Sequence, residues 1–267
     1  MKDLSNENIV HINKNGVQYI QFRKLLEYKE LVHCFTLKPL NFAGYDSYKE
    51  KKKEVDDSYN KICKTLDISA KDICRPKQTH TDRVEKISDG DEGIYNPKFD
   101  NVDALVTNSK NKALTLCFAD CTPLLFYDPV KNVIANTHSG WKGTYQEIAS
   151  KTVKKLIEEY DCKPEELICC IGPHIRKCHF EVDQDVRDMF YNKFKNLDGI
   201  DKYISKKDTK YYIDTLGINT ENLIKLGLKN ENIIDSKICT VCESNICHSF
   251  RAEKENSGRS IALIELI

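Results

Sequence analysis

Three short segments of this 267-residue chain place a metal-binding side chain beside a tight turn or a strand end. KQTH ends at His80, FADCTP contains Cys121 and NTHSGWKG contains His138. Two imidazoles and one thiolate suit Zn²⁺, and three protein ligands that leave one position open are typical of catalytic zinc sites. Cys121 follows His80 by 41 residues and precedes His138 by 17, so these ligands would come from separate strands. By spacing alone the signal is weak, because a histidine near a buried strand is more often a hydrogen-bonded core residue.

The surroundings of His138 and Cys121 strengthen the signal. An apolar run ends at His138, and Gly140, the only tryptophan (Trp141) and Gly143 follow before a helix is expected. Glycines permit a sharp reversal and a close approach of backbone to a ligand, and the free N–H groups at a helix start favour anions. Asp120 interrupts an apolar run, which is costly unless its carboxylate is paired. We therefore expect both segments to face one pocket.

The elements that must position these side chains are read from hydrophobic patterning. Residues 104–107, 113–127 and 133–137 are apolar runs separated by turn residues, as in strands buried on both faces. Strands and helices mix without strict alternation, which favours an α+β fold with mixed sheets. No linker or repeat divides the chain, so we expect one domain over 1–267. Further strands are expected at 16–22, 30–42, 167–171, 233–239 and 260–267, helices at 48–66, 144–160, 182–194 and 211–228, and a charged loop at 198–210.

Composition limits the classes of function. Lys+Arg and Asp+Glu are 41 each, and this balance argues against nucleic acid as a partner, because phosphate neutralisation needs a basic excess. No apolar run approaches the roughly 20 residues that span a bilayer, and the first residues are polar. We expect a cytoplasmic protein with no membrane partner, in which the 12 cysteines are mostly reduced thiols. Monomer and homodimer both stay open.

Other cysteine and histidine groups are weaker candidates. Cys239 and Cys242, with Cys247-His248, look like half of a zinc ribbon, but no second C-x-x-C pair completes it. Cys178-His179 is a second cluster beside an ordinary strand pattern. We interpret all of these as structural residues. The chain lacks a phosphate-binding Walker loop, a dinucleotide-binding glycine motif and the usual zinc deaminase signature.

Six segments together resemble a known family. KQTH, DNVDALVT, CFADCTPLLFYDP, ANTHSGWKGT, IGPHIRKCHFEV and SFRAEKENSGR, in this order, resemble the landmarks of the YfiH/YlmD family, also called the polyphenol oxidase or laccase-domain family, which includes purine nucleoside phosphorylases. The resemblance implies a four-layer α/β/β/α sandwich with mixed sheets. It implies a metal, zinc or possibly copper, bound by His80, Cys121 and His138. It also implies phosphorolysis of adenosine and inosine, with methylthioadenosine phosphorolysis and adenosine deamination as related activities.

Two positions depart from the family pattern. Lys38 stands where an arginine is common, and Ala252 follows Arg251 where a second arginine is common. Lysine binds phosphate as a point charge without the bidentate geometry of arginine. We expect Lys142, Arg251 or Lys38 to contact phosphate, with Lys38 and Arg251 sharing the role of the family's arginines, and Trp141 to line the substrate site. Beside Cys121, we expect Asp120 to orient a ligand or to shuttle a proton.

Two alternatives belong to other functional classes. A copper-dependent polyphenol oxidase is one, although four-electron reduction of O₂ usually needs several coppers and a single N₂S site offers one. A non-enzymatic binding protein with a structural zinc is the other, and it would require a fourth protein ligand that closes the site.

Overall fold

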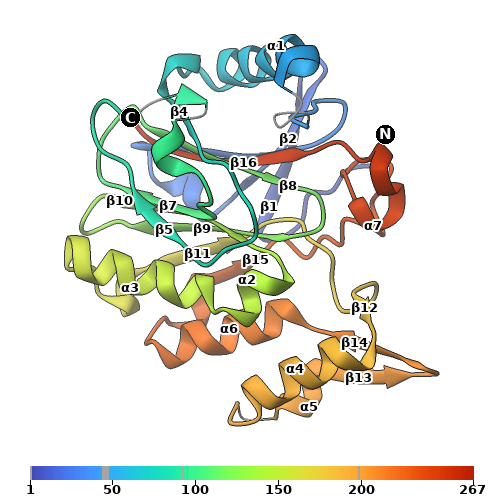
Figure 1. Cartoon of the computed structure of the whole chain (residues 1–267). Coiled ribbons are helices and arrows are strands. Elements are labelled where there is room, and N and C mark those ends of the chain that lie inside the picture. The colour runs from blue at the N-terminus through green and yellow to red at the C-terminus, as the bar shows by residue number, and fades with distance from the viewer. Residues whose placement is uncertain (1, 44–47, 92, 95, 198) are drawn as a thin grey trace.

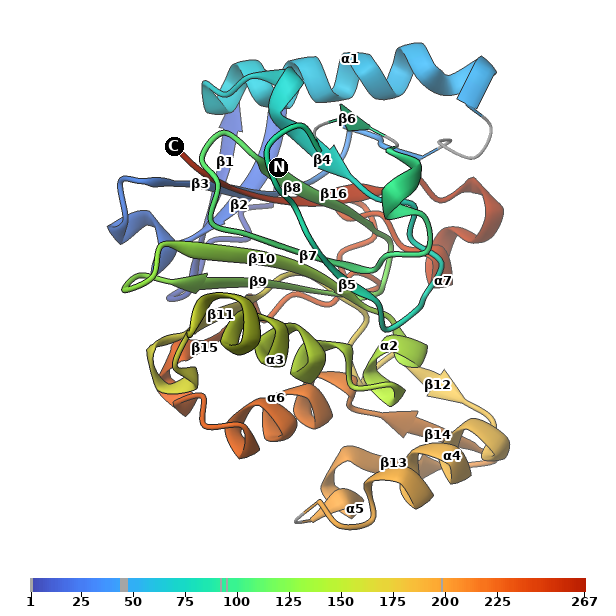
Figure 2. The same ribbon diagram turned by 60° about the vertical axis from the view of Figure 1, so that its left-hand side comes forward.

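The computed structural model describes residues 2–43, 48–91, 93–94, 96–197 and 199–267. Helix α1 (Tyr48–Leu66) covers the outer face of a seven-stranded sheet, and a six-stranded sheet packs against the inner face (Figure 1). Helices α3 (Ile148–Tyr160) and α6 (Thr215–Lys225) cover the outer face of the second sheet, as Figure 2 also shows. The predicted α/β/β/α sandwich is confirmed.

The seven-stranded sheet is mixed. Strand β4 runs parallel to β6 and β8, whereas all other described strand pairs of this sheet are antiparallel. In spatial order the strands are β1 (Ile9–Lys14), β2 (Val17–Phe22), β3 (Leu31–Thr36), β16 (Ser260–Leu266), β8 (Ala113–Phe118), β4 (Ile73–Arg75) and β6 (Gly93–Ile94).

The six-stranded sheet is also mixed. Strand β9 pairs antiparallel with both β10 and β11, whereas β15 and β5 join parallel to β11 and β7. In spatial order the strands are β15 (Ile233–Asp235), β11 (Ile168–Ile171), β9 (Thr122–Asp128), β10 (Val133–Ser139), β7 (Ala104–Thr107) and β5 (Val84–Lys86). In the β9–β10 register His138 lies opposite Pro123, and Ser139 lies opposite Thr122. The pairing therefore brings Cys121, which directly precedes Thr122, close to the end of β10 that carries His138.

Apolar side chains fill the three spaces between the layers. Residues on both inner sheet faces, such as Leu125 and Ile264, form the central core. Val55, Tyr59 and Ile62 recur at helical spacing and bury one face of α1 against the first sheet. Val153 contributes in the same way from α3 to the space under the second sheet. This burial is the main force that holds the sheets and helices together.

A smaller sheet lies beside the sandwich. In spatial order its strands are β12 (Glu181–Val182), β14 (Lys210–Ile213) and β13 (Ile204–Lys207). Helices α4 (Gln184–Phe194) and α5 (Ile200–Tyr203) lie between β12 and β13 along the chain. The expected loop over 198–210 is therefore wrong in its described part, since it contains α5 and β13. The expected helix over 211–228 is wrong at its start, because Tyr211 and Tyr212 pair with both neighbouring strands. The Asp214 side chain accepts the N–H of Gly217 and begins α6 instead.

Two other expected elements are divided. The run 113–127 becomes β8 and β9, which belong to different sheets. The expected helix 144–160 becomes α2 (Trp141–Tyr145) and α3, with Glu147 at a φ of 61° between them. A left-handed residue cannot continue a right-handed helix, so the chain turns there. A short helix α7 (Phe250–Glu253) precedes the last strand.

Among the described residues, no helix has both the length and the apolar character needed to cross a membrane.

Candidate metal centre and pocket

The candidate ligands His80, Cys121 and His138 come from chain segments that meet between the two sheets. His80 lies in the connection from β4 to β5, and Cys121 in the connection from β8 to β9; both connections pass from the first sheet to the second. His138 is the penultimate residue of β10. The structure brings one nitrogen or sulfur atom of each residue within 4.8 Å of the others.

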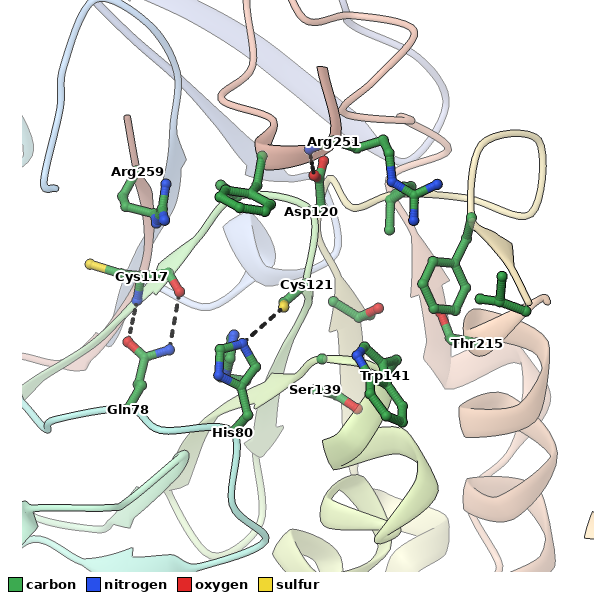
Figure 3. A pocket seen from close by; sticks show the side chains of 18 of the residues that line it. Gln78, His80, Cys117, Asp120, Cys121, Ser139, Trp141, Thr215, Arg251 and Arg259 are labelled. Carbon is green, nitrogen blue, oxygen red and sulfur yellow. Dashed lines mark hydrogen bonds between the residues drawn. The ribbon is translucent and has the colours of Figure 1, made fainter. Parts of the chain in front are cut away.

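The spacing of these atoms fits a metal ion. His80 Nε2 lies 3.8 Å from Cys121 Sγ (Figure 3), and two ligands on a tetrahedral zinc, with Zn–S of about 2.3 Å and Zn–N of about 2.0 Å, lie about 3.5 Å apart. Among the described residues, this group contains three ligand atoms from histidine, cysteine or carboxylate side chains. Two imidazoles and one thiolate leave a fourth position for water or substrate, which is the arrangement of catalytic zinc sites.

Gly140 leaves room beside these ligands. A methyl group added at Gly140 would lie 2.9 Å from Cys121 Sγ and 3.0 Å from His80 Cδ2. Its φ is −67°, which any residue adopts, so glycine is needed here for close approach and not for backbone conformation. This close approach is the role that the sequence predicts for the glycines after His138.

Asp103 positions two of the three candidate ligands. Its Oδ1 lies 2.8 Å from Nδ1 of buried His138 and accepts the backbone N–H of His80 at 3.1 Å. Its Oδ2 accepts the backbone N–H of Thr81 at 2.7 Å. A carboxylate on the second ring nitrogen fixes the tautomer and orientation of a metal-binding histidine. Asp103 is not among the site residues predicted from the sequence, although it lies in the segment DNVDALVT.

Charge is coupled between Cys121 and His138. Burial disfavours the thiolate, but the His138 cation and hydrogen bonds from His138 and His80 outweigh it and lower the pKa of Cys121 to about 6. Burial likewise opposes the imidazolium, but Cys121 and Asp103 raise the pKa of His138 to about 10. A thiolate is the form of cysteine that binds metals.

Asp120 is held by its neighbours. Residue 120 is largely buried, with a φ of 85°, and it turns the chain between the two sheets. Its Oδ1 accepts the hydroxyl of Thr240 at 2.6 Å, and its Oδ2 accepts the backbone N–H of Arg251 at 2.6 Å (Figure 3). Both oxygens have partners, so the carboxylate ties the Cys121 segment to two C-terminal segments.

A large cavity of about 1130 Å³ opens beside the three candidate ligands. Aromatic side chains on its wall include Trp141, Phe180 and Phe250. The charged residues that line it are Arg75, Lys77, Asp120, Glu181, Asp183, Asp185, Arg251, Lys254 and Arg259. The cavity therefore offers flat apolar surfaces, cations and carboxylates next to the candidate metal centre.

The three cations predicted to contact phosphate are separated by the structure. Arg251 lines the cavity and donates to the carbonyl oxygens of His179 and Glu181 at 2.9 and 3.1 Å. Lys38 does not line it, and its Nζ is hydrogen-bonded to Glu253 and to the Ser244 carbonyl, both at 2.6 Å. Lys142 is exposed on α2, with its ammonium 5.6 Å from the Trp141 ring, and does not line the cavity either.

Two further arginines face the cavity. Arg75 is 7% exposed and donates to the Phe42 carbonyl at 3.2 Å. Arg259 donates to the carbonyls of Ser257 and Gly258 at 2.9 and 2.8 Å (its position is shown in Figure 3). Arg259 closes the segment SFRAEKENSGR that the sequence analysis singled out, whereas the short strand around Arg75 carried no comparable signal.

The structure also brings together cysteine and histidine residues of two segments that lie far apart in the sequence. Cys178, His179, Cys239 and Cys242 have ligand atoms within 4.8 Å of one another. Cys247 and His248 lie outside this group; Cys247 is fully buried and His248 Nε2 lies 2.9 Å from the Leu40 carbonyl oxygen. The partner of the C-x-x-C pair is thus the Cys178-His179 pair, about 60 residues earlier.

The chain is similar in sequence to proteins that are named purine nucleoside phosphorylases. "Purine nucleoside phosphorylase YlmD" of Bacillus subtilis is 35% identical over 191 residues, which are 70% of this chain and 68% of the relative. "Purine nucleoside phosphorylase" of Borreliella burgdorferi is 33% identical over 247 residues, 92% of this chain and 95% of the relative.

Solved structures share the fold. The crystal structure of Bacillus licheniformis hypothetical protein YfiH superposes with a TM-score of 0.85 at 29% identity, over 95% of this chain and 100% of that one. YlmD from Geobacillus stearothermophilus gives a TM-score of 0.86 at 23% identity, over 99% of each chain. The model of the family described as "Multi-copper polyphenol oxidoreductase laccase" matches residues 36–267. The chain therefore belongs to this laccase-domain family, that of YfiH and YlmD.

Proposed function

We propose that this protein is a metal-dependent purine nucleoside phosphorylase that acts on adenosine and inosine and releases the free base and ribose 1-phosphate. Methylthioadenosine phosphorolysis and adenosine deamination are proposed as further reactions of the same site. The purine nucleoside phosphorylase names of the relatives support the reaction class. We further propose that residues 1–267 act as one catalytic domain in the cytoplasm.

The observation that carries the proposal is the convergence of three kinds of group on one cavity. His80, Cys121 and His138 offer a metal site in its wall. Trp141 and Phe180 offer flat apolar surfaces for a purine. Arg251 and Arg259 offer guanidinium groups, which match the geometry of phosphate oxygens.

The proposed contacts with phosphate rest on the arginines. We assign them to Arg251 and Arg259, with a further contribution from Arg75, because all three line the cavity. Lys38 and Lys142 lie outside its wall, so their proposed contribution is to the surrounding charge. Asp183 and Asp185 also line the cavity, and carboxylates of this kind accept hydrogen bonds from ribose hydroxyl groups.

Phosphorolysis forms a bond between a phosphate oxygen and C1′ and breaks the bond from C1′ to the purine nitrogen. The purine leaves with the bonding electron pair and is neutralised by a proton. Guanidinium groups hold phosphate against C1′, which converts a bimolecular encounter into a positioned attack. Preorganised polar groups in the cavity stabilise the charge that develops on sugar and base. Asp120 acts by fixing the Cys121 segment against Thr240 and Arg251.

Zinc is the proposed resident metal, and copper is the alternative. The residues fit either ion by donor chemistry, since imidazole and thiolate bind both. When bound, the ion would supply a Lewis acid that polarises the purine or lowers the pKa of a water molecule. Asp103 holds His138 in position for it.

The direct test is an assay of purified protein with defined metal content. Inosine and phosphate should yield hypoxanthine and ribose 1-phosphate, and omission of phosphate should stop the reaction. Adenosine without phosphate should release ammonia if the site also deaminates. Absence of base release from inosine, adenosine and methylthioadenosine, with phosphate and one equivalent of zinc at the site, would contradict the proposal.

Cys121→Ala tests whether the reaction belongs to this site. We expect loss of both phosphorolysis and deamination, because one of three candidate ligands is removed. Cys162→Ala is the matched control, since Cys162 is buried under α3 with the apolar core and does not line the cavity. Near-wild-type inosine phosphorolysis by Cys121→Ala would exclude the assigned site.

The two other classes give different results. A phenol oxidase would show metal-dependent O₂ consumption with phenols, and the family description contains that activity. A single N₂S group in the cavity wall gives little support to multi-copper chemistry. A purely structural zinc needs a closed set of four ligands, whereas this group has three among the described residues and His80 is exposed.

A further inference from the structure

A second group of metal-binding side chains lies outside the cavity lining. It consists of Cys178 and His179, between β11 and β12, and Cys239 and Cys242, between β15 and α7. The Sγ atom of Cys178 lies 3.6 Å from that of Cys239 and 4.0 Å from that of Cys242. Nδ1 of His179 lies 3.2 Å from Cys178 Sγ and 3.6 Å from each of the other two sulfur atoms.

These distances are those of ligands around one tetrahedral ion. With Zn–S of about 2.3 Å and Zn–N of about 2.0 Å, tetrahedral geometry places two sulfur atoms about 3.8 Å apart and a sulfur and a nitrogen about 3.5 Å apart. The observed separations of 3.2–4.0 Å surround these values. Four side chains from two distant segments thus reach the spacing of one Cys₃His shell.

Backbone contacts hold the two segments together beside these ligands. Thr240 donates its N–H to the His174 carbonyl at 3.0 Å. A parallel β-bridge also pairs His174 with Cys239, one of the four residues.

We propose that Cys178, His179, Cys239 and Cys242 bind a second, structural zinc ion in a closed Cys₃His site. Four protein ligands leave no position for substrate, which separates this site from the three-ligand group in the cavity. The ion cross-links residues 178–179 to residues 239–242. This cross-link closes the loop between the two segments. Because the unfolded chain rarely preforms the metal site, the free energy of metal binding adds to the stability of the folded chain.

The site supports the wall of the cavity. Arg251 lines the cavity and donates to the carbonyl oxygen of His179, which is itself one of the four ligands. Thr240 lies between Cys239 and Cys242 and donates its hydroxyl to Asp120 at 2.6 Å. The proposed zinc therefore acts as a positioning element for Arg251 and Asp120. The proposal does not depend on the reaction assigned to the cavity.

Metal content tests the proposal without any activity assay. Reduced, full-length protein supplemented with Zn²⁺ and freed of excess metal should hold about two zinc ions per chain. Cys121→Ala should lose one of them, Cys242→Ser should lose the other, and the double variant should hold almost none. Cys242 is exposed, so a serine there is compatible with folding, which near-ultraviolet circular dichroism checks.

Cys247→Ala is the matched control. Cys247 lies in the same segment but outside the four-residue group, so this variant should keep both zinc ions. Equal zinc content in Cys242→Ser and the wild type would overturn the proposal. So would a Cys121→Ala protein that folds but binds no zinc.

Cobalt titration checks the ligand set. Folded Cys121→Ala should bind one equivalent of Co²⁺ and develop the intense thiolate-to-cobalt absorption of a tetrahedral, sulfur-rich site. The signal should be lost in Cys121→Ala/Cys242→Ser. A disulfide between Cys178 and either Cys239 or Cys242 that mass spectrometry finds in protein purified under reducing conditions would also overturn the proposal, because it removes two ligands.

Discussion

Asp103 Oδ1 lies 2.8 Å from His138 Nδ1, and both side chains are buried. The same carboxylate accepts the backbone N–H of His80. One aspartate thus fixes the ring of one candidate ligand and the chain position of another. The geometry of the candidate metal site therefore depends on a carboxylate that is not itself one of the three candidate ligands.

Asp103→Asn should weaken metal binding at the cavity site. Oδ1 faces both His138 Nδ1 and the N–H of His80, whereas Oδ2 accepts the N–H of Thr81. The asparagine amide places an NH₂ group at one of these two positions, so either His138 and His80 together or Thr81 lose their acceptor. Loss of such an orienting group typically costs about 10–100-fold in metal affinity. Competition with a chelator in a Cys242→Ser background measures the affinity of the cavity site alone.

Asp100→Asn serves as the control for this change, because Asp100 is exposed in the same loop. Its zinc affinity should match that of the parent. An Asp103→Asn protein with unchanged affinity would show that the carboxylate does not orient the ligands.

Gly140→Ala should exclude the metal by steric contact. The added methyl group would lie 2.9 Å from Cys121 Sγ, closer than ordinary non-bonded contact, whereas the backbone angle suits alanine. We expect loss of one zinc equivalent with little change in the melting temperature. Metal analysis and thermal unfolding measure the two effects.

The comparison variant is Gly143→Ala. Its methyl group would meet Ile148 Cγ2 at 3.2 Å and the backbone oxygen of His138 at 3.4 Å, but none of the three ligand side chains, so zinc content should stay at the wild-type level. Full zinc content in Gly140→Ala would mean that the ion sits elsewhere or that the loop yields easily.

Arg251→Ala should raise the KM for phosphate. A charge-assisted hydrogen bond contributes about 1.5–3 kcal/mol, which corresponds to roughly 10–150-fold in affinity. Steady-state kinetics with varied phosphate and saturating inosine measures this change. Lys142→Ala should stay within about twofold of wild type, because Lys142 is exposed and outside the cavity lining. A larger increase of the KM for phosphate in Lys142→Ala than in Arg251→Ala would indicate that Lys142, and not Arg251, contacts phosphate.

Glu265→Gln should stabilise the protein above neutral pH. Glu265 is 1% exposed on β16, and its Oε2 has no hydrogen-bond partner among the described residues. Burial and the nearby Asp72 charge raise the pKa of Glu265 to about 7, against the opposing effect of Lys112. The folded protein therefore binds more protons than the unfolded chain between about pH 4.5 and 7, so this group reduces stability as pH rises through that window.

The glutamine variant removes this dependence and should gain about 2–3 kcal/mol at pH 8 relative to wild type. Urea unfolding at pH 5 and pH 8 measures the free energies. Glu231→Gln, at an exposed position, should leave the pH dependence unchanged. An equal gain at both pH values would point to packing and not to ionisation.

The sequence by itself determined the elements whose patterns are local. Helix α1 has the predicted bounds 48–66, because its apolar residues repeat at three and four positions. The turn residues around Cys121 and His138 also identified the two segments that meet at the cavity. The order of six short motifs identified the family, because each motif is recognised from its residue types and their spacing in the sequence.

Only the tertiary structure decided which distant side chains share a site. Asp103 reaches His138 because β7 and β10 are paired, with Ala104 opposite Thr137. Cys178 and His179 meet Cys239 and Cys242 because parallel β11 and β15 bring the segments after them together. Lys38 is bonded to Glu253, more than 200 residues away. Hydrogen bonds, ion pairs and metal-ligand bonds form only between atoms a few ångströms apart. Separation along the chain does not predict which atoms come that close, because the packing of the two sheets decides it.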